Sequence, residues 1–600
     1  MVDIYRHFKE IFQAILQQIA DENNITLPQQ FFTIEATKEK LHGDLACNAA
    51  MVFSKNFTQI EALNNPRKLA NKIIEKCLSD KNWSHDIAKI EVAGPGFINI
   101  FLKHDILYRV IFSLLTEKKF TFPNLGNGVK VNLEYASPNP TGPIHVGHTR
   151  GSIYGDVLAN LLQKCGYDVL REYYINDAGA QIVTLLKSAY LRYLQALGQN
   201  VEITEGLYPG EYLIEIGVKL KEKFGDNLIK KSQEEALAEI RNFVVDKMVE
   251  LIKSDLLALG IKHDSYFSEK KNLHDTKKID EAINILRQKD LIYEGKLELP
   301  KTEKGVGAKN IELPEGYDEK DQTLFRSTKF GDDQDRVVKK HDGSLTYFAA
   351  DLAYVKNKFE RGATIFIMPL GYDHAGYVKR LTAAVEALTD GKAQLKIILC
   401  QMVKFVKDGE PLKMSKRAGN FITAREVIDE VGADVLRFIM LTRKNDAHFD
   451  FDLTKVIEQS KDNPIFYVQY AYARCSSVLR KLKAETDWQN FITKEPNLDI
   501  LKNLTDEAEI DLIKKIAAFP KLIELAAINF EPHRIAFYLQ ELAADFHALW
   551  NKGSENIDLK FIISNNSDVT QARIYMLRVL MLIIATALEI FNVKPIEEMR

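Results

Sequence analysis

The chain has 600 residues, 46% of them hydrophobic, and a formal net charge of −3 at pH 7. This length allows several domains with large cores, and the small net charge gives no global signal for nucleic acid. The five cysteines are scattered without a CxxC or Cys/His cluster, which argues against a disulfide framework or a structural zinc site. The N-terminus shows no signal-peptide pattern, and the most apolar stretch, 579–588, is too short to span a bilayer, so we expect a cytoplasmic protein without membrane segments.

Residues 1–122 form the first predicted domain, an α+β unit. Helical periodicity covers 4–20, and a second helix is expected to begin near Asp44. A Gly-Pro-Gly turn precedes an alternating strand that begins at Phe97, and a helical run at 107–115 follows. The mixture of helices and strands predicts a separate N-terminal α+β domain.

Residues 129–175 open the second predicted domain, 123–454, with a strand, a helix and a strand. Apolar and polar residues alternate over 129–135, and a proline-rich loop follows. An apolar stripe from Ile153 onward predicts an amphipathic helix, and 168–175 predicts the second strand. This order is the opening β-α-β unit of a Rossmann-type parallel sheet.

The motif His145-Val-Gly-His148 lies where the predicted helix begins. A helix N-terminus offers free N–H groups and the positive end of the dipole, which suits a phosphate. Gly147 would let a ligand approach the backbone, and the two histidines share one helical face from which both can donate. Alone, the motif is equally compatible with a capped helix that carries two solvated histidines.

From about 179 to 330 the pattern is mostly helical and charged, which predicts an insertion between two halves of a nucleotide-binding domain. The sheet is expected to resume with 344–359. Apolar runs at 364–371 and 395–402 predict buried parallel strands, with a helix at 374–388 between them.

Residues 455–600 form the third predicted domain, in which helical periodicity dominates and strand signals nearly vanish. This pattern predicts an all-α bundle. Tyr467, Tyr470 and Tyr472 lie with Arg474 in one predicted helix, and we place Tyr472 in the core because aromatic residues at helical spacing are more often buried.

A second motif, Lys413-Met-Ser-Lys-Arg417, follows much later in the chain. By itself it could be a solvated basic loop. Together, in this order, HVGH and KMSKR resemble the two signature motifs of class I aminoacyl-tRNA synthetases, whose ATP site they form.

Further phrases are similar to one family, the arginyl-tRNA synthetases of bacterial type: EYASPNPTGPIHVGHTRG, REYYINDAGAQI, DGEPLKMSKRAGNF, NPIFYVQYAYAR, HGDLACNAA, PGFINIFL and the ending KPIEEMR. The resemblance covers essentially the whole chain. It implies ATP-dependent activation of L-arginine to arginyl-adenylate, which requires bound tRNA, and transfer to the 3′ end of tRNA(Arg). It also implies a monomer, Mg²⁺ with ATP, and no tightly bound metal or organic cofactor. The domains would then be an additional tRNA-binding domain, a catalytic domain and an anticodon-binding domain.

The resemblance also implies residue roles. The catalytic residues that hold the ATP phosphates are His145, His148, Lys413 and Lys416. Other ATP-binding residues are Pro138, Gly147, His374, Met402, Val403, Met414 and Ser415. The arginine-binding residues are Glu134, Ser137, Asn139, Tyr347, Asp351 and Glu269. The tRNA-binding residues are Phe97, Asn99, Tyr470 and Met599.

The chemistry of the residues supports the arginine pocket in part. Carboxylates match the rigid fork of a guanidinium, and Tyr347 and Asp351 lie four apart, hence on one face of a predicted helix. Without the resemblance, Tyr347 could be a core aromatic and Asp351 a solvated charge, and a capped helix start would explain Asp373 beside His374.

Three other functions remain to be compared: another class I synthetase, a small HxGH nucleotidylyltransferase, and a tRNA-binding protein without activity. The first would bring metal-ligating Cys/His sets or a longer chain, and the second would lack KMSKR. The third would be expected to lose signature residues, and both motifs are intact.

Overall fold

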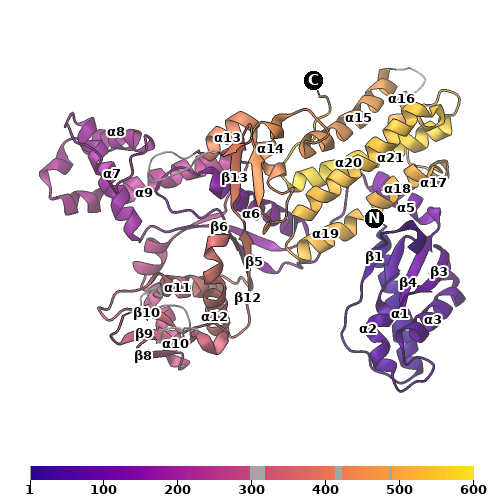
Figure 1. The fold of residues 1–600 in the computed structure, drawn as a ribbon, viewed down its shortest axis with the longest axis horizontal. Coiled ribbons are helices and arrows are strands. Elements are labelled where there is room, and N and C mark those ends of the chain that lie inside the picture. The colour runs from indigo at the N-terminus through magenta and orange to yellow at the C-terminus, as the bar shows by residue number, and fades with distance from the viewer. Residues whose placement is uncertain (1, 298–317, 412–421, 485–488, 600) are drawn as a thin grey trace.

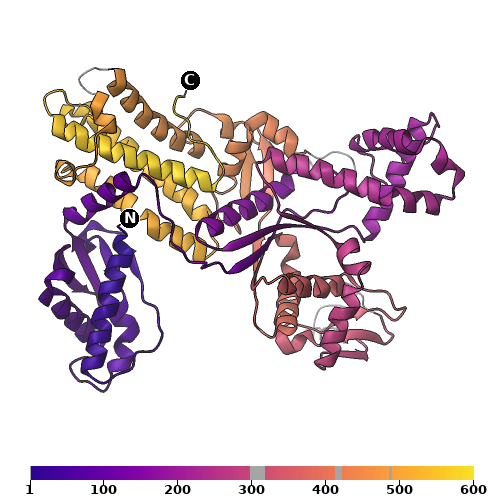
Figure 2. The ribbon, with the colours of Figure 1, turned by 180° about the vertical axis from the view of Figure 1, so that it is seen from behind.

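The computed structural model describes residues 2–297, 318–411, 422–484 and 489–599. The molecule is extended, with a parallel sheet near its centre (Figure 1). In the view from behind, the helical bundle has one end near the central sheet and one end far from the α7–α9 lobe, residues 180–258. The N-terminal domain lies below that far end (Figure 2). Within the described residues, no helix is long and apolar enough to cross a membrane.

The N-terminal domain is a four-stranded antiparallel sheet packed against helices. Its strands are ordered β1 (Ile34–Ala36), β2 (Leu45–Cys47), β4 (Phe97–Leu102), β3 (Ile87–Ala93). Its helices are α1 (Ile4–Glu22), α2 (Ala49–Phe53), α3 (Pro66–Ser79), α4 (Lys81–Ser84) and α5 (His104–Glu117). The helix expected near Asp44 is wrong, because Leu45 and Cys47 bury their side chains on one face of β2, which pairs with β4, and helix begins only at Ala49.

The central sheet has five parallel strands, as a Rossmann-type fold requires. Their order is β12 (Gln394–Cys400), β11 (Ile365–Gly371), β5 (Lys130–Glu134), β6 (Asp168–Ile175), β7 (Ser265–Ser268). Helices α6 (Val146–Lys164), α11 (Tyr347–Glu360) and α12 (Val378–Thr389) connect or cover the strands. The carboxyl ends of β5, β11 and β12 therefore meet at one edge, which is where such sheets present ligand groups.

Residues 179–330 are less uniformly helical than expected. Three helices form a projecting lobe, α7 (Ala180–Ala196), α8 (Tyr212–Phe224) and α9 (Gln233–Ala258). β7 then returns to the central sheet beside β6. Helix α10 (Lys278–Gln288) leads to a separate antiparallel sheet of β8 (Ile292–Gly295), β9 (Gln322–Phe325) and β10 (Arg336–Lys339). The expectation of one helical insertion is corrected, since strands of four residues give too little alternation to be recognised.

A small sheet and two short helices follow the central sheet. The sheet contains β13 (Val403–Lys407), β14 (Glu410–Pro411) and β15 (Phe449–Asp452), with β13 between the others. Helices α13 (Ala424–Val431) and α14 (Ala433–Ile439) are separated by Gly432, whose φ of 85° breaks the helix. The chain therefore forms a helix, a glycine turn and a second helix here.

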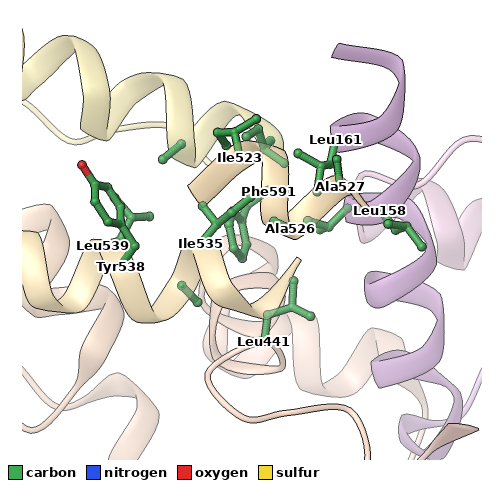
Figure 3. Packing of buried hydrophobic residues seen from close by; sticks show 14 of the residues in the cluster. Leu158, Leu161, Leu441, Ile523, Ala526, Ala527, Ile535, Tyr538, Leu539 and Phe591 are labelled. Carbon is green, nitrogen blue, oxygen red and sulfur yellow. The ribbon is translucent and has the colours of Figure 1, made fainter. Parts of the chain in front are cut away.

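The C-terminal bundle contains α15 (Pro464–Ala484), α16 (Gln489–Thr493), α17 (Leu498–Leu501), α18 (Glu507–Ala517), α19 (Phe519–Ile528), α20 (His533–Glu555) and α21 (Ser567–Ile590). Beyond residue 455, the described part of the chain contains no strand, so the all-α prediction is confirmed. Leu158 and Leu161 of α6 pack against Ala526 and Ala527 of α19 and against Phe591 (Figure 3). The bundle and the central helix thus share one core.

Candidate active site

The first turn of α6 carries both histidines of HVGH. His145 is the N-cap residue, and its Nδ1 accepts a hydrogen bond from the Gly147 N–H at 3.1 Å. The His145 and His148 rings stack with centroids 3.6 Å apart. A Cβ at Gly147 would lie 2.9 Å from the His145 ring, so glycine admits that ring over the helix start. Two half-buried imidazoles at a helix N-terminus can both donate toward a phosphate.

The chain that follows KMSKR returns to this helix start. The Val146 N–H donates to the Ile422 carbonyl at 3.1 Å, and the Ala424 N–H donates to the Ile144 carbonyl at 2.7 Å. His145 also forms an antiparallel bridge with Thr423. Lys413, Met414, Ser415 and Lys416 lie outside the described residues. The chain re-enters the described part of the structure at Ile422, one hydrogen bond away from HVGH.

Three of the predicted arginine-binding carboxylates, Glu134, Asp351 and Glu269, act electrostatically on the phenol of Tyr174. Burial raises the pKa of Tyr174 well above its usual value, and the charges of Glu269, Asp351 and Glu134 add to that shift. Glu269 is 5% exposed, accepts a hydrogen bond from Tyr174, and lies 3.0 Å from Nε2 of His274. Such a set of carboxylates matches a guanidinium in charge and geometry.

Glu134 is already half of a buried ion pair. Nζ of Lys358, a residue only 2% exposed, lies 2.6 Å from the Glu134 carboxylate. Beside it, the guanidinium of Arg361 binds the buried Glu172 carboxylate with two 2.7 Å hydrogen bonds. Glu134 is therefore paired with Lys358 and is not a lone acceptor.

The proline-rich loop, the β6–α7 loop and the start of α11 meet around the remaining arginine-site candidates. Nδ2 of Asn139 donates to Gln181 at 2.8 Å, and Oγ of Ser137 accepts a backbone N–H of β6 at 3.0 Å. Tyr347 is 55% exposed, and its hydroxyl would lie 3.5 Å from a Cβ at Gly179. These segments form the walls of one site at the carboxyl edge of the sheet.

The other ATP-site candidates lie at the same edge. His374 is exposed in the 3₁₀ helix Tyr372–Tyr377 that follows β11. Met402 is 65% exposed immediately after β12, whereas Val403 is buried at the start of β13. The Pro138 carbonyl accepts a hydrogen bond from the buried Tyr173 hydroxyl. Among the described residues, no cluster of His, Cys, Asp or Glu could hold a metal ion.

The predicted tRNA-binding residues lie far from this edge, in the two terminal domains. Phe97 is 39% exposed at the start of β4, but Asn99 is buried within the sheet, opposite Ala46 and Glu91. Tyr470 is partly buried in α15, where the Arg474 guanidinium lies 4.2 Å from its ring centroid.

The chain end that carries Met599 is bound to α15. Nε2 of Gln469 donates to the Lys594 carbonyl, and its Oε1 accepts the Ile596 N–H, both at 2.8 Å. The segment that leads to Met599 is therefore held against α15, the helix that carries Tyr470. Tyr472, which we expected in the core, is half-buried and packs against the hydrophobic core.

Sequence reasoning missed four residues of the site: Tyr174, Gln181, Lys358 and Thr423. Tyr174 and Gln181 lie inside the phrase REYYINDAGAQI, which could have identified them. Lys358 gives no such signal, because its partner Glu134 is 224 positions away.

The chain is similar to known proteins over its whole length. Family models match residues 6–102 (arginyl tRNA synthetase N terminal domain), 110–467 (tRNA synthetases class I (R), catalytic domain) and 468–599 (DALR anticodon binding domain). Proteins named arginine–tRNA ligase are 48% identical in Ruegeria pomeroyi and 50% identical in Brucella anthropi. Each alignment covers all of this chain and at least 99% of the relative. The Thermus thermophilus arginyl-tRNA synthetase structure is 18% identical, covers 99% of this chain and 100% of its own, and shares the fold with a TM-score of 0.69.

Proposed function

The chain belongs to the arginyl-tRNA synthetase family, and from this premise we propose that it activates L-arginine with ATP and transfers the arginyl group to the 3′ end of tRNA(Arg). One observation carries the proposal. The HVGH helix start, the chain leaving KMSKR and the carboxylates near Tyr174 lie at one edge of the parallel sheet. That arrangement provides for both reactants of an activation step.

In the first step, the arginine carboxylate attacks the α-phosphate of ATP, an arginyl-adenylate forms and diphosphate leaves. The carboxylate is ionised at neutral pH, so no strong general base is needed. His145 and His148 donate to the phosphates at the positive end of α6, and Lys413 and Lys416 neutralise the β- and γ-phosphates. Mg²⁺ accompanies ATP and offsets the same charge. Catalysis then rests on positioning and charge stabilisation.

Arginine is recognised through its guanidinium. Asp351 and Glu269 supply negative charge beside Tyr174, and the Tyr347 hydroxyl offers a further polar group at the pocket wall. Glu134 at the end of β5, and Ser137 and Asn139 on the loop that leads to HVGH, contact the amino-acid end of the substrate. Pro138, Gly147, His374, Met402, Val403, Met414 and Ser415 complete the ATP site.

In the second step, a hydroxyl of the terminal ribose of tRNA attacks the activated carbonyl and AMP leaves. We assign tRNA contacts to 1–122 and 455–600, and the chemistry to 123–454. Phe97 and Asn99 would act in the first of these domains, and Tyr470 and Met599 in the last. Base recognition by stacking fits the Tyr470 and Arg474 pair. We further propose that the protein is a cytoplasmic monomer.

The test is arginine-dependent exchange of diphosphate into ATP with tRNA present. His148→Ala and Lys416→Ala are each expected to reduce the rate by about 100-fold or more, because each removes a group that stabilises charge in the transition state. His341→Ala and Lys392→Ala, both outside the site, serve as matched controls and should retain the wild-type rate. Undiminished exchange in either test variant would refute these assignments.

A further inference from the structure

Arg150 is a buried guanidinium on the HVGH helix that has no role in the proposed chemistry. It is 2% exposed and lies two residues after His148. Its Nη1 donates to the carbonyls of Gln401 at 3.1 Å and Ala447 at 2.8 Å, and its Nη2 donates to the Lys444 carbonyl at 2.7 Å. Burial lowers the pKa of Arg150 from its usual value, so placing the cation here costs free energy.

The three carbonyls belong to two segments, one of which leads into Met402 and Val403, the residues assigned to ATP. Gln401 joins β12 to β13 and immediately precedes Met402 and Val403. Lys444 and Ala447 lie in the α14–β15 loop, and β15 pairs with β13 in parallel. The Arg150 fork therefore attaches both segments to the helix that carries the two histidines.

These segments are also attached to each other. The Gln401 N–H donates to the Asn445 carbonyl at 2.8 Å, and Nδ2 of Asn445 donates to the Leu399 carbonyl at 2.9 Å. The Arg150 guanidinium further lies 5.8 Å from the Phe449 ring centroid, at the start of β15. Removing Arg150 would remove three hydrogen bonds that hold the two linked segments to α6.

We propose that Arg150 is a positioning residue that fixes the distance between the nucleoside-binding segment at 401–403 and the phosphate-binding turn at 145–148. This inference rests on the proposed function, since Met402 and Val403 are assigned to ATP there. A planar, five-donor guanidinium can hold several carbonyls in a fixed geometry, whereas a lysine ammonium cannot. ATP binds across both segments, but arginine does not, so misplacement affects the two substrates differently.

The test compares Arg150→Lys with wild type in the diphosphate exchange assay, with the KM values for ATP and for arginine measured separately. We expect the KM for ATP to rise by about tenfold or more and the KM for arginine to change by less than about twofold. Asn445→Ala removes one bond of the same assembly and should raise the KM for ATP by a smaller factor.

Arg573→Lys is the matched control for loss of a buried guanidinium. Arg573 is 4% exposed in the bundle, where it binds Glu509 at 2.6 Å and the Lys560 carbonyl at 2.7 Å. This variant should lower the melting temperature without changing the KM for ATP. An unchanged KM for ATP in Arg150→Lys, or equal rises for ATP and arginine, would overturn the inference. Absence of exchange activity in the wild type would instead refute the proposed function.

Discussion

The helical bundle meets the rest of the molecule in two different ways. Toward α6 the contact is apolar and fully buried, with Leu158 and Leu161 against Ala526 and Ala527 (Figure 3). Its charged components include the buried Arg437, which is 1% exposed, and the ion pair of Lys164 with Glu589 at 2.9 Å. An apolar contact of this kind is insensitive to salt and keeps the two parts in one arrangement.

Toward the N-terminal sheet, the bundle makes exposed ion pairs around a cavity of about 890 Å³. Lys40 pairs with Glu507 and Asp511 of α18, and Lys514 pairs with Asp44 at 2.6 Å. Helix α5 does pack into the bundle, but the sheet itself is held by charges. Salt screens exposed pairs, so this contact can open while the contact with α6 stays closed.

The largest expected effect comes from breaking the charged part of the α6 contact. Arg437 donates to the Asp156 carboxylate of α6, to the Leu259 carbonyl at 2.8 Å and to the Phe591 carbonyl. Arg437→Met would leave Asp156 buried without its cation and should lower the free energy of unfolding by about 3–5 kcal/mol. Urea denaturation measures this loss. Adding Asp156→Asn should recover part of it, and a loss in Arg437→Met below about 1 kcal/mol would show that the pair is not needed.

An intermediate effect is expected at the sheet beneath the active site. Burial alone would raise the pKa of Glu172, but the hydrogen bonds and charge of Arg361 outweigh it and lower the pKa from 4.5 to about 2. The ionised pair therefore stabilises the fold fully above pH 4.5, and this stability is lost as the pH falls toward 2. Arg361→Gln should cost about 3 kcal/mol at pH 7. That difference from wild type should shrink between pH 4.5 and 2. A difference independent of pH would contradict the assignment.

The smallest effect on stability is expected at the N-terminal contact. Lys40→Ala with Lys514→Ala removes the ion pairs to α18 and Asp44 but buries no unpaired charge. Small-angle scattering should show a larger radius of gyration, and wild type in 1 M salt, where the Debye length is about 3 Å, should expand likewise. The melting temperature should stay at the wild-type value. Lys55→Ala, which changes an exposed lysine of the same domain, is the control. Unchanged scattering in the double variant and at high salt would refute the contrast between this charged contact and the apolar contact with α6.

The elements around the signature motif could be predicted because their patterns are long and local. The alternation before Tyr135, the apolar stripe after Ile153 and the strand at 168–175 correspond to β5, α6 and β6. β7 was missed because four residues at a sheet edge, flanked by helices, carry too short a pattern. The helix expected near Asp44 was wrong for a different reason. The small apolar residues that follow Asp44 are compatible with a helix or a strand, so the local pattern does not decide between the two.

Site residues could be predicted where they lie in a sequence motif. They could not be predicted where their contacts are with residues far away in the chain. HVGH indicated a phosphate-facing helix start, and the structure places it beside Ile422. The ion pair of Glu134 with Lys358 and the three carbonyls on Arg150 join positions far apart in the chain, so no local pattern contains them. Residues 413–416 lie outside the described residues, so the roles assigned to them stay predictions.

The most direct test of the central claim is to charge a total tRNA pool with each amino acid in turn, with ATP and Mg²⁺. Stable attachment to tRNA should be seen for arginine alone, with release of AMP and diphosphate. The same reaction with Tyr347→Ala or Asp351→Ala should lose this product, because we assign both side chains to arginine binding. Charging of a different amino acid, or none at all, would contradict the account.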